Sequence, residues 1–229
     1  MGLFVVMEEM NSKVLKKRSL FRDEICERIE EAIFTGELKA GDRIVETRWA
    51  RELGVSQSPV REAIRLLESK GLVETVPFQG TYVRKASKKD IADLSRVRKV
   101  LEGMAVEEAL DHLTDEYLEK ILEAYEQMLA AAREGNMVGY INYDTLFHRL
   151  IVELSPNEFL HRAWEQCNIK EWTFWGTQEF MQENMEELAL RHEPICTALK
   201  NRDREALIHE AAFHIDRLID TVMASSAEE

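Results

Sequence analysis

The sequence has no apolar run of about 18 residues, the length at which a segment is read as a membrane-spanning helix, so no transmembrane segment and no membrane partner are expected. Cysteine is also scarce. The cysteines are odd in number, widely spaced and without a C-x-x-C pair: Cys26, Cys167 and Cys196. We expect these thiols to lie as small buried residues in a reducing compartment, which predicts a cytoplasmic location.

Positive charge is scarce in most of the chain. The 229 residues carry a formal net charge of -13, which by itself disfavours nucleic acid because phosphate repels an anion. The charge is unevenly distributed: residues 1–90 hold 17 Lys and Arg against 15 Asp and Glu, whereas residues 91–229 hold 13 against 28. This length, with 45% hydrophobic residues, is enough for two modest domains, of which the first is better suited to approach a polyanion.

Apolar spacing in the first part of the chain predicts a helix-turn-helix. One apolar stripe covers residues 21–35, and a short helix with Leu53 on its inner side is expected over residues 46–53. A third helix follows after a tight link, with Ser56 or Ser58 as its N-terminal cap. Two helices joined in this way are typical of DNA-binding helix-turn-helix motifs.

The third helix carries a row of long polar side chains on a second face. Gln57, Arg61 and Arg65 recur at every fourth position, about 100° around the helix from the apolar stripe. In a major groove such donors can reach base edges, while Arg51 on the preceding helix can meet a phosphate. The alternative is an ordinary solvated helix face.

A short β-ribbon is expected after the third helix. Residues 72–76 and 81–84 have the composition of strands, and residues 77–80 form the turn, so they predict a two-stranded wing. Gly80 at the tip would let the backbone approach a minor groove closely. Residues 46–89 hold nine Lys and Arg against five Glu, which suits contact with phosphate.

Several motifs in this region resemble one known family, and together they cover roughly residues 20–85. They are Ile33–Asp42, Leu53–Ser56, Ser58–Ala63, Leu67–Val73 and Gly80–Val83. The combination is similar to the winged-helix domain of GntR-family regulators, and the resemblance implies operator contacts by Arg51, Arg61 and Gly80. Gln57 departs from the Arg that the family often has there, and Gln reads adenine better than guanine. The full set expected at DNA is Arg51, Gln57, Ser58, Arg61, Arg65 and Gly80.

The rest of the chain predicts helices and no strands. Residues 87–90 have the pattern of a capping box that opens a long helix. Five further helices are expected, which makes a mainly α protein with a C-terminal antiparallel six-helix bundle large enough to hold a ligand: 115–133, 137–154, 157–180, 184–200 and 203–223. The expected organisation is an extension 1–19, a winged helix-turn-helix domain 20–85, a linker 86–90, a helical domain 91–223 and a tail 224–229.

Four residues of the second part suggest a metal site. Asp144 and His148 lie four residues apart and leave one face of one helix, while His192 and His214 lie on later helices among apolar neighbours. An Asp and three His would suit a divalent transition metal such as zinc, nickel, manganese or iron. The alternative is a set of core histidines that are hydrogen-bonded to neighbours.

A second resemblance covers about residues 90–222. Arg98–Ala105, Asp144–His148, Arg191–His192 and His214–Ile215 are similar to the FCD effector domain found behind GntR winged helices. The resemblance implies that the four residues above hold the metal with open positions for a small carboxylate, and that Arg98 pairs with that carboxylate. The alternative for Arg98 is an ion pair with Glu102 within the helix.

Two further features concern the shape of this site. Pro194 is expected to kink a continuous helix close to His192, which would re-aim that ligand. Four aromatic residues are candidates for lining the pocket, with core or dimer packing as the alternative: Trp164, Trp172, Phe174 and Trp175.

These expectations together predict a DNA-binding transcription regulator rather than an enzyme. A homodimer would present two recognition helices to double-stranded operator DNA, and a small organic acid at the metal would control operator affinity. Two alternatives stay open, a metal-dependent hydrolase and a regulator with a purely structural metal.

Overall fold

The computed structural model describes residues 21–180 and 184–225. The expected extension 1–19 and most of the expected tail lie outside these ranges. The chain divides into two compact units, residues 1–85 and 86–229. Within the described ranges, every helix is too short or too polar to cross a membrane.

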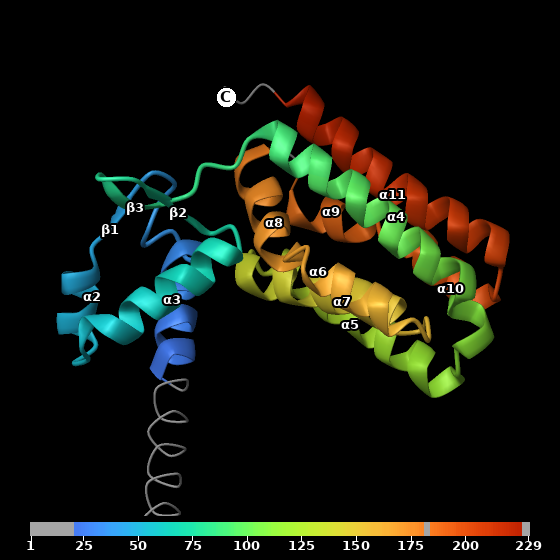
Figure 1. Cartoon of the computed structure of the whole chain (residues 1–229). Coiled ribbons are helices and arrows are strands. Elements are labelled where there is room, and N and C mark those ends of the chain that lie inside the picture. The colour runs from blue at the N-terminus through green and yellow to red at the C-terminus, as the bar shows by residue number, and fades with distance from the viewer. Residues whose placement is uncertain (1–20, 181–183, 226–229) are drawn as a thin grey trace, which may run out of the picture. The chain divides into compact units, whose positions relative to one another are not determined.

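The first unit combines three helices with a small sheet (Figure 1). Its elements are a first helix over residues 21–34, β1 (Arg43–Ile44), α2 (Glu46–Glu52), α3 (Gln57–Ser69), β2 (Val73–Val76) and β3 (Gly80–Val83). The core fills the space between the helices with buried side chains such as Ile29, Ile64 and Leu67. Leu53, expected to face inward, is 36% exposed because α2 ends one residue before it.

The expected two-stranded wing is part of a three-stranded antiparallel sheet. β3 lies in the centre, with β2 on one side and β1 on the other. Arg43 pairs with Tyr82 across β1 and β3, and Val76 pairs with Gly80 where β2 turns back into β3. A strand of two residues is too short to show alternating polarity, which is why the sequence did not reveal β1.

The second unit is entirely helical in its described residues, and the capping box of Ser87 with Asp90 is present at its start. Its elements are α4 (Lys88–His112), α5 (Asp115–Arg133), α6 (Met137–Val152), α7 (Glu158–Glu165), α8 (Ile169–Trp175), the π-helical turn η1 (Gly176–Phe180), α9 (Met185–Leu190), α10 (Glu193–Asn201) and α11 (Arg204–Ala224). α4 begins inside the segment expected as a linker. α4 packs along α11, and α5 along α6 (Figure 1).

Two of the six helices predicted for this unit are each divided among the residues that the structure describes. The helix expected over 157–180 is interrupted at Asn168, which adopts a left-handed conformation at φ 49°. The helix expected over 184–200 ends at Leu190, and α10 begins after His192 with Pro194 in its first turn. Pro194 therefore starts a new helix instead of kinking a continuous one, since a proline costs no hydrogen bond there.

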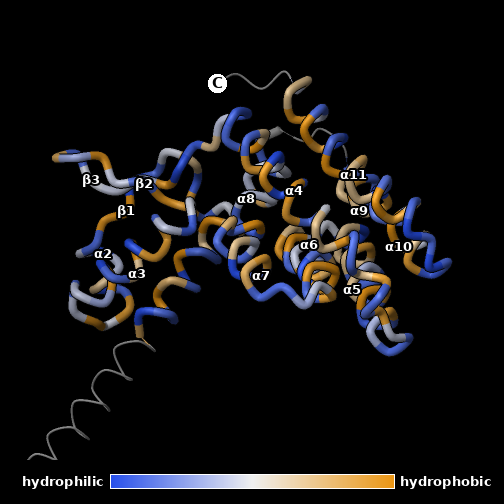
Figure 2. The backbone as a smooth tube through the Cα atoms, turned by 45° about the vertical axis from the view of Figure 1, so that its right-hand side comes forward, coloured by the Kyte–Doolittle hydropathy of each residue, from blue (hydrophilic) through white to orange (hydrophobic). Residues whose placement is uncertain are grey.

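α6 is the central helix of this unit and is buried on more than one face. Figure 2 shows hydrophobic and hydrophilic residues alternating along the helices around it, as expected for surface helices with one apolar face. On α6 itself, Phe147 and Ile151 join the apolar core, while Asp144 and His148 are also buried. Buried polar groups need partners, so Asp144 and His148 indicate a polar site inside this unit.

Candidate metal centre and nucleic-acid interface

The residues expected at DNA lie on one exposed side of α3 and on neighbouring elements of the first unit. Gln57, Ser58 and Arg65 are exposed on α3, and Arg51 is exposed on α2. Val60, Ala63, Ile64 and Leu67 turn the opposite side of α3 into the core. The amphipathic division that the sequence predicted for this helix is therefore present.

Arg61 is exposed but is not a free donor. Its guanidinium contacts Glu46 at the start of α2, with Nη2 2.9 Å from Oε2 and Nε 3.3 Å from Oε1. The hydrogen bond and the charge of Glu46 raise the pKa of Arg61, which stays protonated. Ser56 stands at the N-cap of α3, although its side chain makes no capping hydrogen bond, so neither proposed serine caps through its hydroxyl.

The wing tip depends on Gly80. Its φ of +120° is strained for any residue with a Cβ, and an added Cβ would lie 3.0 Å from the guanidinium of Arg43. Arg43 thus crosses the tip of the wing and places a cation beside the expected backbone contact. Sequence reasoning missed Arg43, because its proximity to Gly80 arises from the unrecognised strand β1.

In the second unit, His148, His192 and His214 come together from three separate segments, and one ligand atom from each lies within 4.8 Å of the others. His148 Nε2 and His192 Nε2 are 3.1 Å apart, and Asp144 Oδ1 is 3.2 Å from His192 Nε2. Metal–nitrogen bonds of about 2.0–2.1 Å place neighbouring ligand atoms roughly 3 Å apart around one ion. The four residues predicted to form the site are therefore close enough to share a cation.

Hydrogen bonds on the far side of two rings decide which nitrogens face the centre. His148 Nδ1 lies 3.0 Å from Glu102 Oε2, and His192 Nδ1 lies 3.1 Å from the carbonyl of Ala189. A carbonyl and an ionised carboxylate only accept, so a neutral ring carries its proton on Nδ1 in both cases. Both Nε2 lone pairs then point at the centre, together with the oxygen of Asp144.

The charge state of the site favours a cation. Burial holds the pKa of His148 and His214 below the usual range for histidine, and in His214 the two neighbouring rings add to the effect. Burial alone would raise the pKa of Asp144, but contact with the neighbouring histidines and the positive charge of Arg98 outweigh it, so the carboxyl is ionised. Neutral imidazoles and a carboxylate are the protonation states that bind metal.

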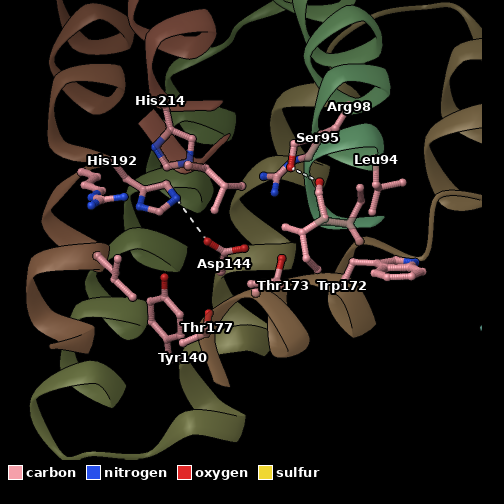
Figure 3. Close-up of a pocket in the computed structure, with 16 residues that line it drawn as sticks. Leu94, Ser95, Arg98, Tyr140, Asp144, Trp172, Thr173, Thr177, His192 and His214 are labelled. Atoms are coloured by element: carbon pink, nitrogen blue, oxygen red, sulfur yellow. Dashed lines mark hydrogen bonds and ion pairs between the residues drawn. The ribbon is translucent and has the colours of Figure 1, made fainter. Parts of the chain in front are cut away.

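A cavity of about 50 Å³ adjoins these residues (Figure 3). Arg98 of α4 reaches into it, facing Asp144 and His192. Hydroxyl-bearing residues share the lining: Ser95, Tyr140, Thr173 and Thr177. Among the described residues, Arg98 Nη2, Asp144 Oδ2 and His214 Nδ1 are buried in this region without a hydrogen-bond partner.

Arg98 also forms the intrahelical pair that the sequence left open as an alternative. Its Nε lies 2.5 Å from Glu102 Oε1, and both side chains are buried. The pair uses Nε and leaves Nη2 directed at the cavity, so the two interpretations of Arg98 are compatible.

Of the four aromatic candidates, Trp172 lines the cavity. Trp164, Phe174 and Trp175 are buried in the packed interior, which agrees with the alternative of core packing. Of the three cysteines, Cys26 and Cys196 are buried as expected, whereas Cys167 is half-buried.

Comparison with known proteins identifies both units. Residues 21–83 match the bacterial regulatory proteins of the gntR family, and residues 93–217 match the FCD domain. The chain belongs to the GntR family. Like its relatives, it is a DNA-binding transcription regulator and not an enzyme, so the hydrolase alternative is set aside.

This GntR-family chain is similar along most of its length to other regulators. It is 31% identical to the uncharacterized HTH-type transcriptional regulator YdhC of Bacillus subtilis (strain 168), over 90% of this chain and 93% of that protein. It is 31% identical to a probable D-xylose utilization operon transcriptional repressor of Paenarthrobacter nicotinovorans, over 86% and 87%. The solved structure of E. coli McbR/YncC matches with a TM-score of 0.71 and 27% identity, over 89% of this chain and 97% of that one.

Sequence reasoning about this GntR-family protein gave Glu102 no part in the metal site. It is buried and contacts Arg98, His148 and Trp164. A hint was available in its spacing of four residues from Arg98, but its contact with His148 spans 46 positions and is not visible in a sequence.

Proposed function

We propose that this regulator binds a divalent transition metal through Asp144, His148, His192 and His214, and that a small organic acid bound beside the metal controls its affinity for operator DNA. The observation that carries this proposal is the close approach of three side chains, with His192 Nε2 3.1 Å from His148 Nε2 and 3.2 Å from Asp144 Oδ1. When both rings are neutral and carry their protons on Nδ1, these three atoms are all acceptors, and a cation between them would relieve their mutual repulsion.

The carboxylate of a small acid would accept a hydrogen bond from the unpaired donor of Arg98. Arg98 Nη2 is buried without a partner in the described residues, and leaving such a group unpaired costs about 1–3 kcal/mol. A carboxylate that bonds to Arg98 and to an open metal position would satisfy both groups. The metal, when bound, would act as a Lewis acid that attracts the carboxylate and is not consumed.

The cavity indicates a small ligand. Its volume of about 50 Å³ exceeds the minimum that one ordered water needs, but it leaves room for few heavy atoms without rearrangement. The hydroxyls of Ser95, Tyr140, Thr173 and Thr177 suit a ligand that carries its own hydroxyl groups. Relatives include a gluconate operon transcriptional repressor of Bacillus subtilis, 24% identical, which supports a hydroxy acid as the class to test first.

On DNA, a homodimer would place two α3 helices in successive major grooves of a pseudo-palindromic operator. Arg51, Gln57, Ser58, Arg61 and Arg65 would contact the duplex from α2 and α3, with Gly80 at the wing. The acid must then stabilise one placement of the DNA-binding units over another, because a ligand without such a preference regulates nothing.

The test has two stages. Metal content is measured on the purified full chain, and thermal unfolding is followed with zinc, nickel, manganese or iron and a panel of hydroxy acids, for the natural chain and for His192→Ala. We expect metal to raise the unfolding temperature of the natural chain and an acid to raise it further, with both effects reduced in the variant. Absence of any metal response would refute the site, and a metal response without any acid response would support a purely structural metal.

The second stage measures operator binding. Duplexes retained from fragmented genomic DNA give the operator, and its Kd is then measured with and without the stabilising acid, together with the mass of the complex. A shift in Kd supports acid control. An unchanged Kd would leave a DNA-binding protein whose metal does not regulate it.

A further inference from the structure

Glu102 contacts both a proposed metal ligand, His148, and the proposed acid-binding residue, Arg98. Glu102 is 5% exposed and lies on α4, one helical turn beyond Arg98. Oε2 lies 3.0 Å from Nδ1 of His148 on α6. Oε1 accepts hydrogen bonds from Nε of Arg98, at 2.5 Å, and from Nε1 of Trp164 on α7, at 3.0 Å.

This carboxylate sets the orientation of a metal ligand. As an acceptor it requires the proton of neutral His148 to be on Nδ1, and this leaves the Nε2 lone pair facing His192 and Asp144. Outer partners of this kind fix the ring and raise its basicity as a ligand. Without Glu102, neutral His148 would be free to carry its proton on Nε2, where it would oppose a cation.

The same carboxylate also sets the orientation of the proposed acid-binding group. By holding Nε of Arg98, Glu102 directs the guanidinium so that Nη2 enters the cavity, where it has no partner among the described residues. The two oxygens belong to one planar carboxylate. A shift of Oε2 toward His148 would therefore also move Oε1, which holds Arg98.

We propose that Glu102 is a positioning residue that couples occupancy of the metal site to the orientation of Arg98, and so links ion binding to acid binding. With a cation on its Nε2, the His148 ring would be a stronger donor, and its Nδ1–H bond to Oε2 would strengthen. The change in that bond alters the bonds from Arg98 and Trp164 to Oε1. The inference rests on the proposed function, because it needs an ion and an acid to share the site, and linkage makes the coupling reciprocal.

Glu102→Gln tests the coupling because it keeps the shape and removes one acceptor. Three donors face this side chain, from Arg98, His148 and Trp164, and a glutamine offers one oxygen and one donating NH2 group. If the NH2 group faces Arg98 and Trp164, donors face donors; if it faces His148, the neutral ring must move its proton to Nε2, where it opposes a cation. We expect the Kd for zinc to rise about 10- to 100-fold, the usual range for loss of an outer partner of a metal ligand.

The probe is zinc alone, added to metal-free full-length protein. Zinc should shift the NMR resonances of the Arg98 Nε–H and the Trp164 indole N–H in the natural chain, and these shifts should be lost or much reduced in Glu102→Gln. Glu108→Gln is the matched control on the same helix, since Glu108 accepts from Ser155 Oγ at 2.7 Å. It should leave both the zinc Kd and the two shifts unchanged.

The outcomes separate this inference from the proposed function. Failure of the natural chain to bind zinc would overturn both. Zinc binding with the same Kd and the same resonance shifts in Glu102→Gln would overturn the coupling and leave the metal site intact. If Glu102→Gln does not fold, the natural chain decides: a shift of the Arg98 Nε–H resonance on zinc binding supports the coupling, and an unchanged resonance with zinc bound overturns it.

Discussion

The two units of this regulator use arginine in opposite ways. Arg61 on α3 is exposed and pairs with Glu46 across two helices, so water screens the pair. Arg98 on α4 is buried and pairs with Glu102 within its own helix, away from water. The first unit exposes the guanidinium of Arg61 on its surface, where an outside partner can reach it. The second unit buries the guanidinium of Arg98 in its interior.

The largest effect should come from breaking the buried pair. Arg98→Met leaves the Glu102 carboxylate buried without its cation, and we expect the free energy of unfolding to fall by about 3–5 kcal/mol. Arg61→Met makes the same substitution in the exposed pair and should leave the unfolding midpoint unchanged. Chemical denaturation of both variants measures the difference. Equal losses in the two would mean that burial does not distinguish the pairs.

On operator binding, Arg61→Met should have a larger effect than Arg98→Met. Arg61→Met should raise the operator Kd roughly 10- to 100-fold, because the side chain is expected to bond to a base edge or a phosphate. Glu46→Gln is the control in the opposite direction: it releases Arg61 and removes a negative charge near the duplex, so the Kd should fall. An operator Kd that Arg61→Met does not alter would remove Arg61 from the interface.

The same contrast explains what the sequence could predict. The row of Gln57, Arg61 and Arg65 and the pair of Asp144 and His148 each lie on one helix, so their spacing places them on one face. The approach of His192 and His214 to that pair depends on how α6, α10 and α11 pack, and it was implied by family resemblance, not by spacing. The contact of Arg61 with Glu46 also joins two helices, across 15 positions of sequence, and was not foreseen.

Helix boundaries show a similar limit. The apolar periodicity continues through both breaks: Leu160, Trp164 and Ile169 join one buried cluster on the two sides of Asn168, and α9 and α10 both pack against α5. The breaks themselves depend on single residues, Asn168 in a left-handed conformation and Pro194 at the start of α10. A periodic pattern predicts which face is buried better than it predicts where a helix stops.

A smaller effect is expected at the wing, where the first unit has its own close contact. Gly80→Ala places a Cβ 3.0 Å from the Arg43 guanidinium at a φ of +120°, so the unit should lose about 1–3 kcal/mol of stability. Gly36→Ala is the matched control: its φ is +77°, and open space surrounds the added Cβ, so a loss near the lower end of that range is expected. Thermal unfolding of both variants measures the two costs. A smaller loss for Gly80→Ala than for Gly36→Ala would show that Arg43 moves away freely.

The smallest effect should be a gain in stability at the same wing. Phe78 has a φ of +63° and its side chain is fully exposed, so the fold bears a strained backbone there and gains no packing from the ring. Phe78→Gly removes the strain at some cost in chain entropy, and we expect a net stabilisation of about 0.5–1 kcal/mol. Gln79→Gly, at a position without a positive φ, should instead destabilise by a similar amount, because it adds entropy to the unfolded chain and relieves nothing. Denaturant titration of the pair checks the sign, and a loss of stability in Phe78→Gly would mean that the ring has a structural role in the wing.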